Sequence, residues 1–252
     1  MVIFNLKQTL LFLVFLLIVS CIQAKTQLPS IPPDCTETST IQSDKAADGL
    51  SFDVFLPPCY EQETNIRYPI LIWTTSPLLI DTPAESLINN QEIHPLIIIK
   101  LFNSGGENYE QRLAEELVPY VDTHYRTIAE RPFRAVAGIS YGGAIAARSG
   151  WRYPGLFGQA ITISGGIANN EKGKFTDWIT AVSPGEYPNI LIDVGTDDGI
   201  MPLTDDYRNV LDNQEVPYTF TSQPGGHASQ YWSTHIPDYL RWLDTTWLDQ
   251  EN

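Results

Sequence analysis

The chain has 252 residues, of which 43% are hydrophobic and 18% are charged, and these proportions suit one globular domain with a sizeable core. Its formal net charge of −15 repels nucleic acid and anionic membrane surfaces, so we expect no nucleic-acid partner. The same charge mildly favours neutral or cationic substrates.

The first two dozen residues have the pattern of a targeting segment. A single charge, Lys7, precedes an apolar run over residues 9–20, which has signal-peptide length and is too short for a comfortable membrane span. Two interpretations of its processing stay open. A general signal peptidase would remove residues 1–24, whereas a bacterial lipobox would remove residues 1–20 and make Cys21 a lipidated N-terminus. Both predict export, with membrane contact only through such a lipid anchor; an uncleaved signal anchor is the alternative.

Two further cysteines, Cys35 and Cys59, remain after either cleavage. Export implies an oxidising compartment, where an even number of cysteines tends to pair. We therefore predict a Cys35–Cys59 disulfide that ties the N-terminal segment to the end of an early strand. The alternative is a pair of free buried thiols.

The predicted elements begin after a polar segment. Residues 25–49 are rich in Ser, Thr, Asp and Pro and predict a linker before a domain over residues 50–252. From there to the end of the chain, apolar runs alternate with helical patterns. Alternating or continuous apolar runs predict strands over residues 51–56, 68–73, 95–102, 133–139, 159–164, 189–194 and 218–222.

Helical patterns separate these strands. Thr82, Pro83 and Glu85 predict a helix start, with Thr82 as the N-cap and Glu85 completing a capping box. Strands separated by helices predict βαβ crossovers and a mostly parallel sheet with helices on both faces, an α/β fold. In such sheets the active site lies at the carboxyl ends of the strands. Further helices are expected over residues 109–126, 141–152, around 177, 203–211 and 229–248.

The sequence Gly-Ile-Ser-Tyr-Gly at residues 138–142 matches the G-x-S-x-G pattern of a nucleophile elbow. The pattern alone is weak, because about one chain in ten of this length carries it by chance. Here it ends a predicted strand and opens a small-residue helix, which is the setting that an elbow requires. Ser140 is therefore the candidate nucleophile, and a serine needs a base to activate it.

His227 is the candidate base, because it follows the strand predicted over residues 218–222 and precedes the last helix. The other histidines are placed differently: His94 precedes a strand, and His124 and His235 lie within predicted helices.

The acid that orients this base is expected after the strand over residues 189–194, where Asp197 and Asp198 both qualify. Asp193 lies inside the strand and is a weaker candidate. The chain order of serine, aspartate and histidine is the one expected of α/β-hydrolases.

Tyr141 is expected to donate one oxyanion N–H, and the segment Thr-Thr-Ser-Pro-Leu at residues 74–78 the other. Four aromatic residues are candidates for lining an acyl or aromatic pocket: Phe102, Trp151, Trp178 and Trp232.

Taken together, these segments resemble the esterase D-type α/β-hydrolases, a group that includes feruloyl, acetylxylan and siderophore esterases and secreted mycolyltransferases. The resemblance covers residues from about 50 to 245. It rests on VFLPPCY at 54–60, ELVPYVD at 116–122, YRT at 125–127, GISYGG at 138–143, YPGLFG at 153–158, SG at 164–165 and PGGHASQYW at 224–232.

The resemblance implies a choice between the two acids and exposes one departure. The family's Gly-Thr-x-Asp pattern maps onto residues 195–198, which points to Asp198, with Asp197 second. Family members usually have a Gly-containing pair after the second strand, but here the aligned donor is Pro77, which has no N–H. We expect the loop to shift so that Ser76 or Leu78 donates; otherwise a Thr75 or Ser76 hydroxyl substitutes, or hydrolysis is impaired.

The resulting hypothesis is a secreted or periplasmic serine carboxylic-ester hydrolase that forms an acyl-enzyme on Ser140. Its substrate is expected to be a small-molecule or glycan-linked ester, with no metal ion and no cofactor. Two alternatives stay open. One is an acyltransferase to a sugar or lipid alcohol, and the other is a non-catalytic binding protein that keeps the fold, for which Pro77 is the only support.

Overall fold

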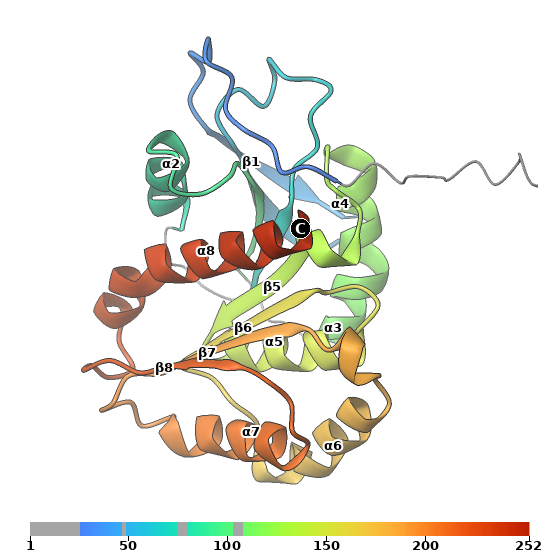
Figure 1. Cartoon of the computed structure of the whole chain (residues 1–252), viewed down its shortest axis with the longest axis vertical. Helices are drawn as coiled ribbons and strands as arrows, with labels where there is room; N and C mark the ends of the chain where they lie inside the picture. Colours follow the sequence, from blue (N-terminus) through green and yellow to red (C-terminus); the bar gives the residue numbers. More distant parts are fainter. Residues whose placement is uncertain (1–25, 47–48, 75–79, 103–107, 252) are drawn as a thin grey trace, which may run out of the picture.

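A computed structural model describes residues 26–46, 49–74, 80–102 and 108–251 (Figure 1). Within them, an eight-stranded sheet has the order β1–β2–β4–β3–β5–β6–β7–β8. β1–β2 and β2–β4 are antiparallel pairs, and every pair from β4 to β8 is parallel. The predicted α/β-hydrolase architecture, a mostly parallel sheet with helices on both faces, is confirmed.

All seven predicted strands are present, shifted by at most two residues at an end. They are β2 (Ser51–Leu56), β3 (Ile70–Thr74), β4 (Ile97–Leu101), β5 (Arg134–Ile139), β6 (Gln159–Ile163), β7 (Asn189–Asp193) and β8 (Thr219–Thr221). The central strands β3 to β6 are buried at every position, which explains their mostly apolar sequences.

The prediction of a linker over residues 25–49 is wrong in part, because Thr40–Lys45 forms the edge strand β1. β1 pairs with β2 from Thr40 opposite Leu56 to Lys45 opposite Ser51. Its side chains are mostly exposed, so it carries no apolar pattern that a sequence could reveal.

The helices are α2 (Asp81–Asn89), α3 (Tyr109–Arg112), α4 (Val118–His124), α5 (Tyr141–Arg152), α6 (Lys172–Thr180), α7 (Met201–Asn213) and α8 (Ser229–Glu251). A π-helical turn, Leu113–Leu117, joins α3 to α4 within the single helix that the sequence predicts. Short 3₁₀ turns lie at Arg131–Phe133, Asn169–Glu171 and Pro184–Glu186. In the part of the chain that the structure describes, no helix has the length and apolarity needed to cross a membrane.

The predicted capping box at the start of α2 is wrong. The helix begins at Asp81, its N-cap is Ile80, and no side chain caps it. The Glu85 carboxylate instead accepts a hydrogen bond from the Ser39 backbone at 3.1 Å. A long-range contact to the N-terminal segment therefore replaces the local cap.

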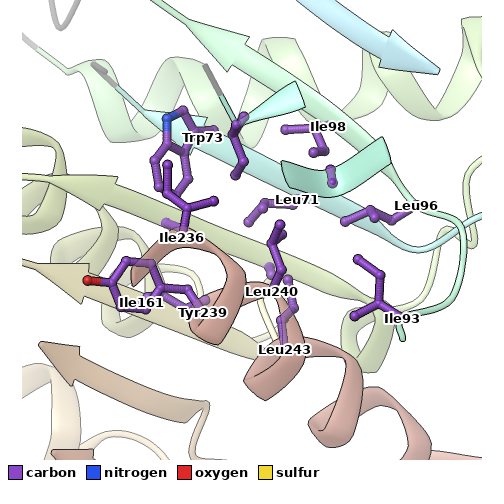
Figure 2. Close-up of a cluster of buried hydrophobic side chains, with 14 of the residues drawn as sticks. Leu71, Trp73, Ile93, Leu96, Ile98, Ile161, Ile236, Tyr239, Leu240 and Leu243 are labelled. Carbon is purple, nitrogen blue, oxygen red and sulfur yellow. The ribbon is translucent and has the colours of Figure 1, made fainter. Parts of the chain in front are cut away.

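Helices cover both faces of the sheet (Figure 1). α2 and α8 pack on one face, where α8 places Ile236, Tyr239, Leu240 and Leu243 against strand side chains such as Leu71 (Figure 2). Neighbouring strand positions point the other way, as the twofold period of a strand requires, and meet helices α3 to α5. α6 and α7 pack against Ile190 and Ile192 of β7.

The predicted disulfide is present: Cys35 and Cys59 are bonded, with Cα atoms 5.8 Å apart. Cys59 is buried and lies just after β2, so the bond fastens the N-terminal segment to the domain. Closing a loop of this size stabilises the folded state by about 3 kcal/mol on the chain-entropy model.

Replacing both cysteines by serine is therefore expected to lower the free energy of unfolding by about 3 kcal/mol, because the unfolded chain regains its loop entropy. Urea denaturation of the oxidised wild type and the double variant measures the difference. A reductant should bring the wild type to the stability of the variant and leave the variant unchanged. Equal stability of the two oxidised proteins would contradict the expectation.

Candidate active site

Ser140 occupies a sharp turn between β5 and α5. Its backbone has φ 57° and ψ −120°, in the positive-φ region that residues other than glycine rarely adopt. Such a conformation costs about 1–3 kcal/mol and persists only where its surroundings impose it. The backbone N–H of Ser140 donates to the carbonyl of Ile163 on β6 at 2.8 Å, which ties the turn to the carboxyl edge of the sheet.

Close packing explains the first glycine of the G-x-S-x-G pattern. A Cβ atom on Gly138 would lie 2.2 Å from Oγ1 of Thr74 and 2.4 Å from the carbonyl carbon of Gly142. The buried Thr74 hydroxyl, at the end of β3, lies 2.9 Å from the Gly142 carbonyl. Only a residue without a side chain fits between them, so the pattern records a steric requirement of the turn.

The structure brings three of the predicted site residues together. Nε2 of His227 lies 3.0 Å from Oγ of Ser140, and Nδ1 lies 3.0 Å from each carboxylate oxygen of Asp198. A tautomer protonated on Nδ1 donates to Asp198 and leaves Nε2 to accept from the serine hydroxyl. The Asp198 side chain is fully buried, whereas that of His227 is 37% exposed.

Asp197, the alternative acid, is exposed. Its backbone N–H donates to the carbonyl of Gly225 at 2.9 Å. One residue earlier, the N–H of Thr196 donates to the carbonyl of Gln223 at 2.9 Å. The loop that carries Asp198 and the loop that carries His227 are thus joined by backbone hydrogen bonds, which fixes the carboxylate relative to the imidazole.

The sequence did not predict the contacts that the Trp232 side chain makes in the site. Its indole lies perpendicular to the His227 ring at a centroid distance of 4.9 Å, and its N–H donates to the Ser164 hydroxyl at 2.7 Å. Ser164 follows β6 with φ 43° and is buried beside the elbow. The indole therefore connects the imidazole to the strand end that supports Ser140. Trp232 and Ser164 both lie in segments that carry the family resemblance, but no sequence pattern relates one to the other.

The four aromatic pocket candidates have different surroundings. Trp151 is 2% exposed and donates to the Tyr207 hydroxyl, so it belongs to the core and cannot contact a substrate. Trp178 packs on Phe175 of the same helix, α6. Phe102 is 52% exposed just after β4, at the carboxyl edge of the sheet.

Tyr141 opens helix α5, where the backbone N–H groups of the first turn have no acceptor within the helix. That position suits an oxyanion donor beside Ser140. Ser76, Pro77 and the rest of residues 75–79 lie outside the described residues, as does Cys21, so the second donor and the lipidation site stay predictions.

The other histidines have partners elsewhere. Nδ1 of His94 lies 2.9 Å from Asp244, His124 stacks on Tyr120, and Nδ1 of His235 lies 3.5 Å from Asp238. Among residues 26–46, 49–74, 80–102 and 108–251, no group of three or more His, Cys, Asp or Glu side chains is arranged to bind a metal ion. The arrangement around Ser140 suits activation of a serine hydroxyl for attack on a carbonyl carbon.

Comparison with known proteins relates this chain to esterases. The family model described as "Putative esterase" matches residues 43–243. An endo-1,4-beta-xylanase/feruloyl esterase of Xylanibacter ruminicola is 33% identical over 102 residues, which cover 36% of this chain and 14% of that protein.

Solved structures share the fold. A ferulic acid esterase superposes with a TM-score of 0.72 at 22% identity, covering 84% of this chain and 99% of the other. The S-formylglutathione hydrolase of Staphylococcus aureus superposes with a TM-score of 0.67 at 17% identity, covering 84% and 98%.

Proposed function

The chain belongs to this family of esterases, which are carboxylic ester hydrolases, and we propose that it cleaves its substrate through an acyl-enzyme on Ser140. The observation that supports this most strongly is the pair of contacts made by His227, 3.0 Å to Ser140 Oγ and 3.0 Å to Asp198. These link a nucleophile, a base and a buried acid in the order that serine hydrolysis needs.

In the first half of the reaction, Nε2 of His227 accepts the hydroxyl proton as Ser140 Oγ attacks the ester carbonyl carbon. The carbonyl oxygen becomes an oxyanion, to which the Tyr141 N–H donates. The Asp198 carboxylate stabilises the imidazolium and keeps the ring oriented. As the tetrahedral intermediate collapses, the imidazolium protonates the leaving alcohol, and the acyl group stays on Ser140.

In the second half, water takes the place of the alcohol. His227 removes a proton from the water, the hydroxide attacks the acyl carbon, and the imidazolium returns the proton to Ser140 Oγ as the carboxylic acid leaves. His227 thus acts as base and then as acid in both halves of the reaction, which consumes one water molecule for each ester cleaved.

We propose that the substrate carries an apolar or aromatic group. Tyr141 is 57% exposed, Phe102 is 52% exposed and Leu203 is 36% exposed. Phe102 follows β4, Tyr141 follows Ser140 and Leu203 lies in the first turn of α7, so all three lie at the carboxyl edge of the sheet. Relatives named as feruloyl and ferulic acid esterases make hydroxycinnamate esters the first substrates to test.

A panel of esters tests the proposal. We expect the purified chain to hydrolyse methyl ferulate and p-nitrophenyl esters, and to leave the matching amides intact. Acetyl-sugar esters, p-nitrophenyl esters of graded length and S-formylglutathione complete the panel. Faster product formation with an added alcohol than with water would indicate an acyltransferase. If the protein hydrolyses none of these esters, the proposal is refuted and a binding protein is favoured.

We propose that the protein acts outside the cytoplasm. The apolar run over residues 9–20 and the Cys35–Cys59 disulfide both support export. Removal of residues 1–24 would release the protein, whereas lipidation of Cys21 would anchor it. Intact mass measurement of the exported protein distinguishes the two, because a lipidated chain begins at Cys21 and carries additional acyl mass.

A further inference from the structure

A second buried carboxylate lies next to the site but takes no part in the proposed reaction. Asp193 ends β7 and is 1% exposed. One of its oxygens accepts hydrogen bonds from Thr221 at 2.6 Å and Tyr231 at 3.2 Å, and the other accepts from Tyr239 at 2.7 Å. No lysine, arginine or histidine of the described residues pairs with it. Burying a carboxylate without a counter-charge is costly, so these hydroxyls must compensate it.

The two tyrosines lie on α8 but differ in what else they touch. The Tyr231 ring lies against Gly225, where an added Cβ atom would be 2.5 Å from the ring. Tyr239, by contrast, faces the sheet among the core side chains of α8 (Figure 2).

Gly225 and Gln223 belong to the segment that ends in His227. Gly225 has φ 151°, a conformation suited to glycine, and its carbonyl accepts the Asp197 N–H. The Tyr231 ring therefore limits where this segment lies on one side, and the Asp198 loop limits it on the other. A shift of Tyr231 would move the imidazole relative to Ser140.

We propose that Asp193 and Tyr231 are positioning residues for His227. The carboxylate fixes the Tyr231 hydroxyl, and the ring of Tyr231, which lies against Gly225, fixes the segment 223–227. The inference rests on the proposed function, because it concerns the 3.0 Å contact between His227 Nε2 and Ser140 Oγ. Neither residue touches the reacting atoms.

Asp193→Asn would disturb three hydrogen bonds at once, so the two tyrosines give the sharper test. Tyr231→Phe and Tyr239→Phe each remove one hydroxyl from the same carboxylate. The Tyr239 hydrogen bond is the shorter of the two, and no other donor of the described residues reaches the carboxylate oxygen that it binds. In Tyr231→Phe, by contrast, Thr221 still donates to the oxygen that loses the Tyr231 hydroxyl. A purely structural role thus predicts the greater harm from Tyr239→Phe, in stability and activity alike.

The positioning role predicts opposite rankings. Tyr239→Phe lowers the urea midpoint more, whereas Tyr231→Phe lowers kcat for a p-nitrophenyl ester more, by about tenfold with KM little changed, because small misplacements of a catalytic group are costly. The rate at which a fluorophosphonate modifies Ser140 should fall in parallel with kcat. Tyr239→Phe should lower kcat by less than about twofold, since its ring does not touch the His227 segment.

The outcomes separate the two claims. Opposite rankings support the positioning role. An active wild type whose variants lose kcat in the order of their stability, or lose none, overturns the positioning role alone. A folded wild type that neither turns over esters nor reacts with the fluorophosphonate overturns the proposed function, and the positioning role with it.

Discussion

The Ser140→Ala variant is expected to lose about 10⁴- to 10⁶-fold in kcat for ester hydrolysis, the loss seen when the nucleophile of a serine triad is removed. Without Oγ no acyl-enzyme can form, and what remains is the oxyanion site and substrate binding. Steady-state rates with p-nitrophenyl acetate measure the effect. The fold should survive, because alanine is smaller than serine and meets the same backbone strain at this position.

Ser149→Ala is the matched control for this variant. Ser149 lies on α5, the helix that Ser140 precedes, and its buried hydroxyl has no hydrogen-bond partner among the described residues. Its removal is expected to change kcat by less than about twofold, because no reacting group depends on it. Hydrolysis by Ser140→Ala within tenfold of the wild-type rate would contradict the role of Ser140.

The Asp198→Asn variant is expected to lose about 10⁴-fold in kcat while keeping the site geometry, as an amide favours the wrong imidazole tautomer. The amide NH₂ cannot accept the hydrogen bond from Nδ1–H, and the neutral amide does not balance the positive charge of the imidazolium. Near-complete burial of Asp198 strengthens the effect, because solvent cannot replace the lost carboxylate.

Asp197→Asn tests the choice of acid, since it makes the same chemical change one residue away. Asp197 is exposed, and only its backbone joins the His227 loop, so we expect kcat to change by less than about twofold. The comparison needs kcat for both variants under one set of conditions. A larger loss in Asp197→Asn than in Asp198→Asn would transfer the acid role to Asp197.

Much of this site could be predicted because its residues follow strands of one parallel sheet. Ser140 and Asp198 come after buried apolar runs, whereas His227 follows β8, a short and largely exposed strand, and parallel strands end at one edge of a sheet. The steric need for Gly138 adds a second signal that is local in sequence. The choice of Asp198 over Asp197 came from family resemblance, since both follow the same strand.

What could not be predicted depends on long-range contacts. β1 forms because β2 offers it hydrogen-bond partners, although its own side chains are mostly exposed. Glu85 has the right residue type for a capping box but bonds to Ser39, which lies 46 positions away in sequence. The Trp232–Ser164 hydrogen bond and the Asp193 cluster likewise join segments that no local pattern relates.

Mass-spectrometric mapping of a fluorophosphonate label tests the central claim most directly, because the label reports an activated serine without any assumption about the natural ester. We predict one phosphonyl group per chain, on the peptide that contains Ser140, no label in Ser140→Ala and strongly slowed labelling in His227→Ala. A label on a different serine, or undiminished labelling without His227, would contradict the account.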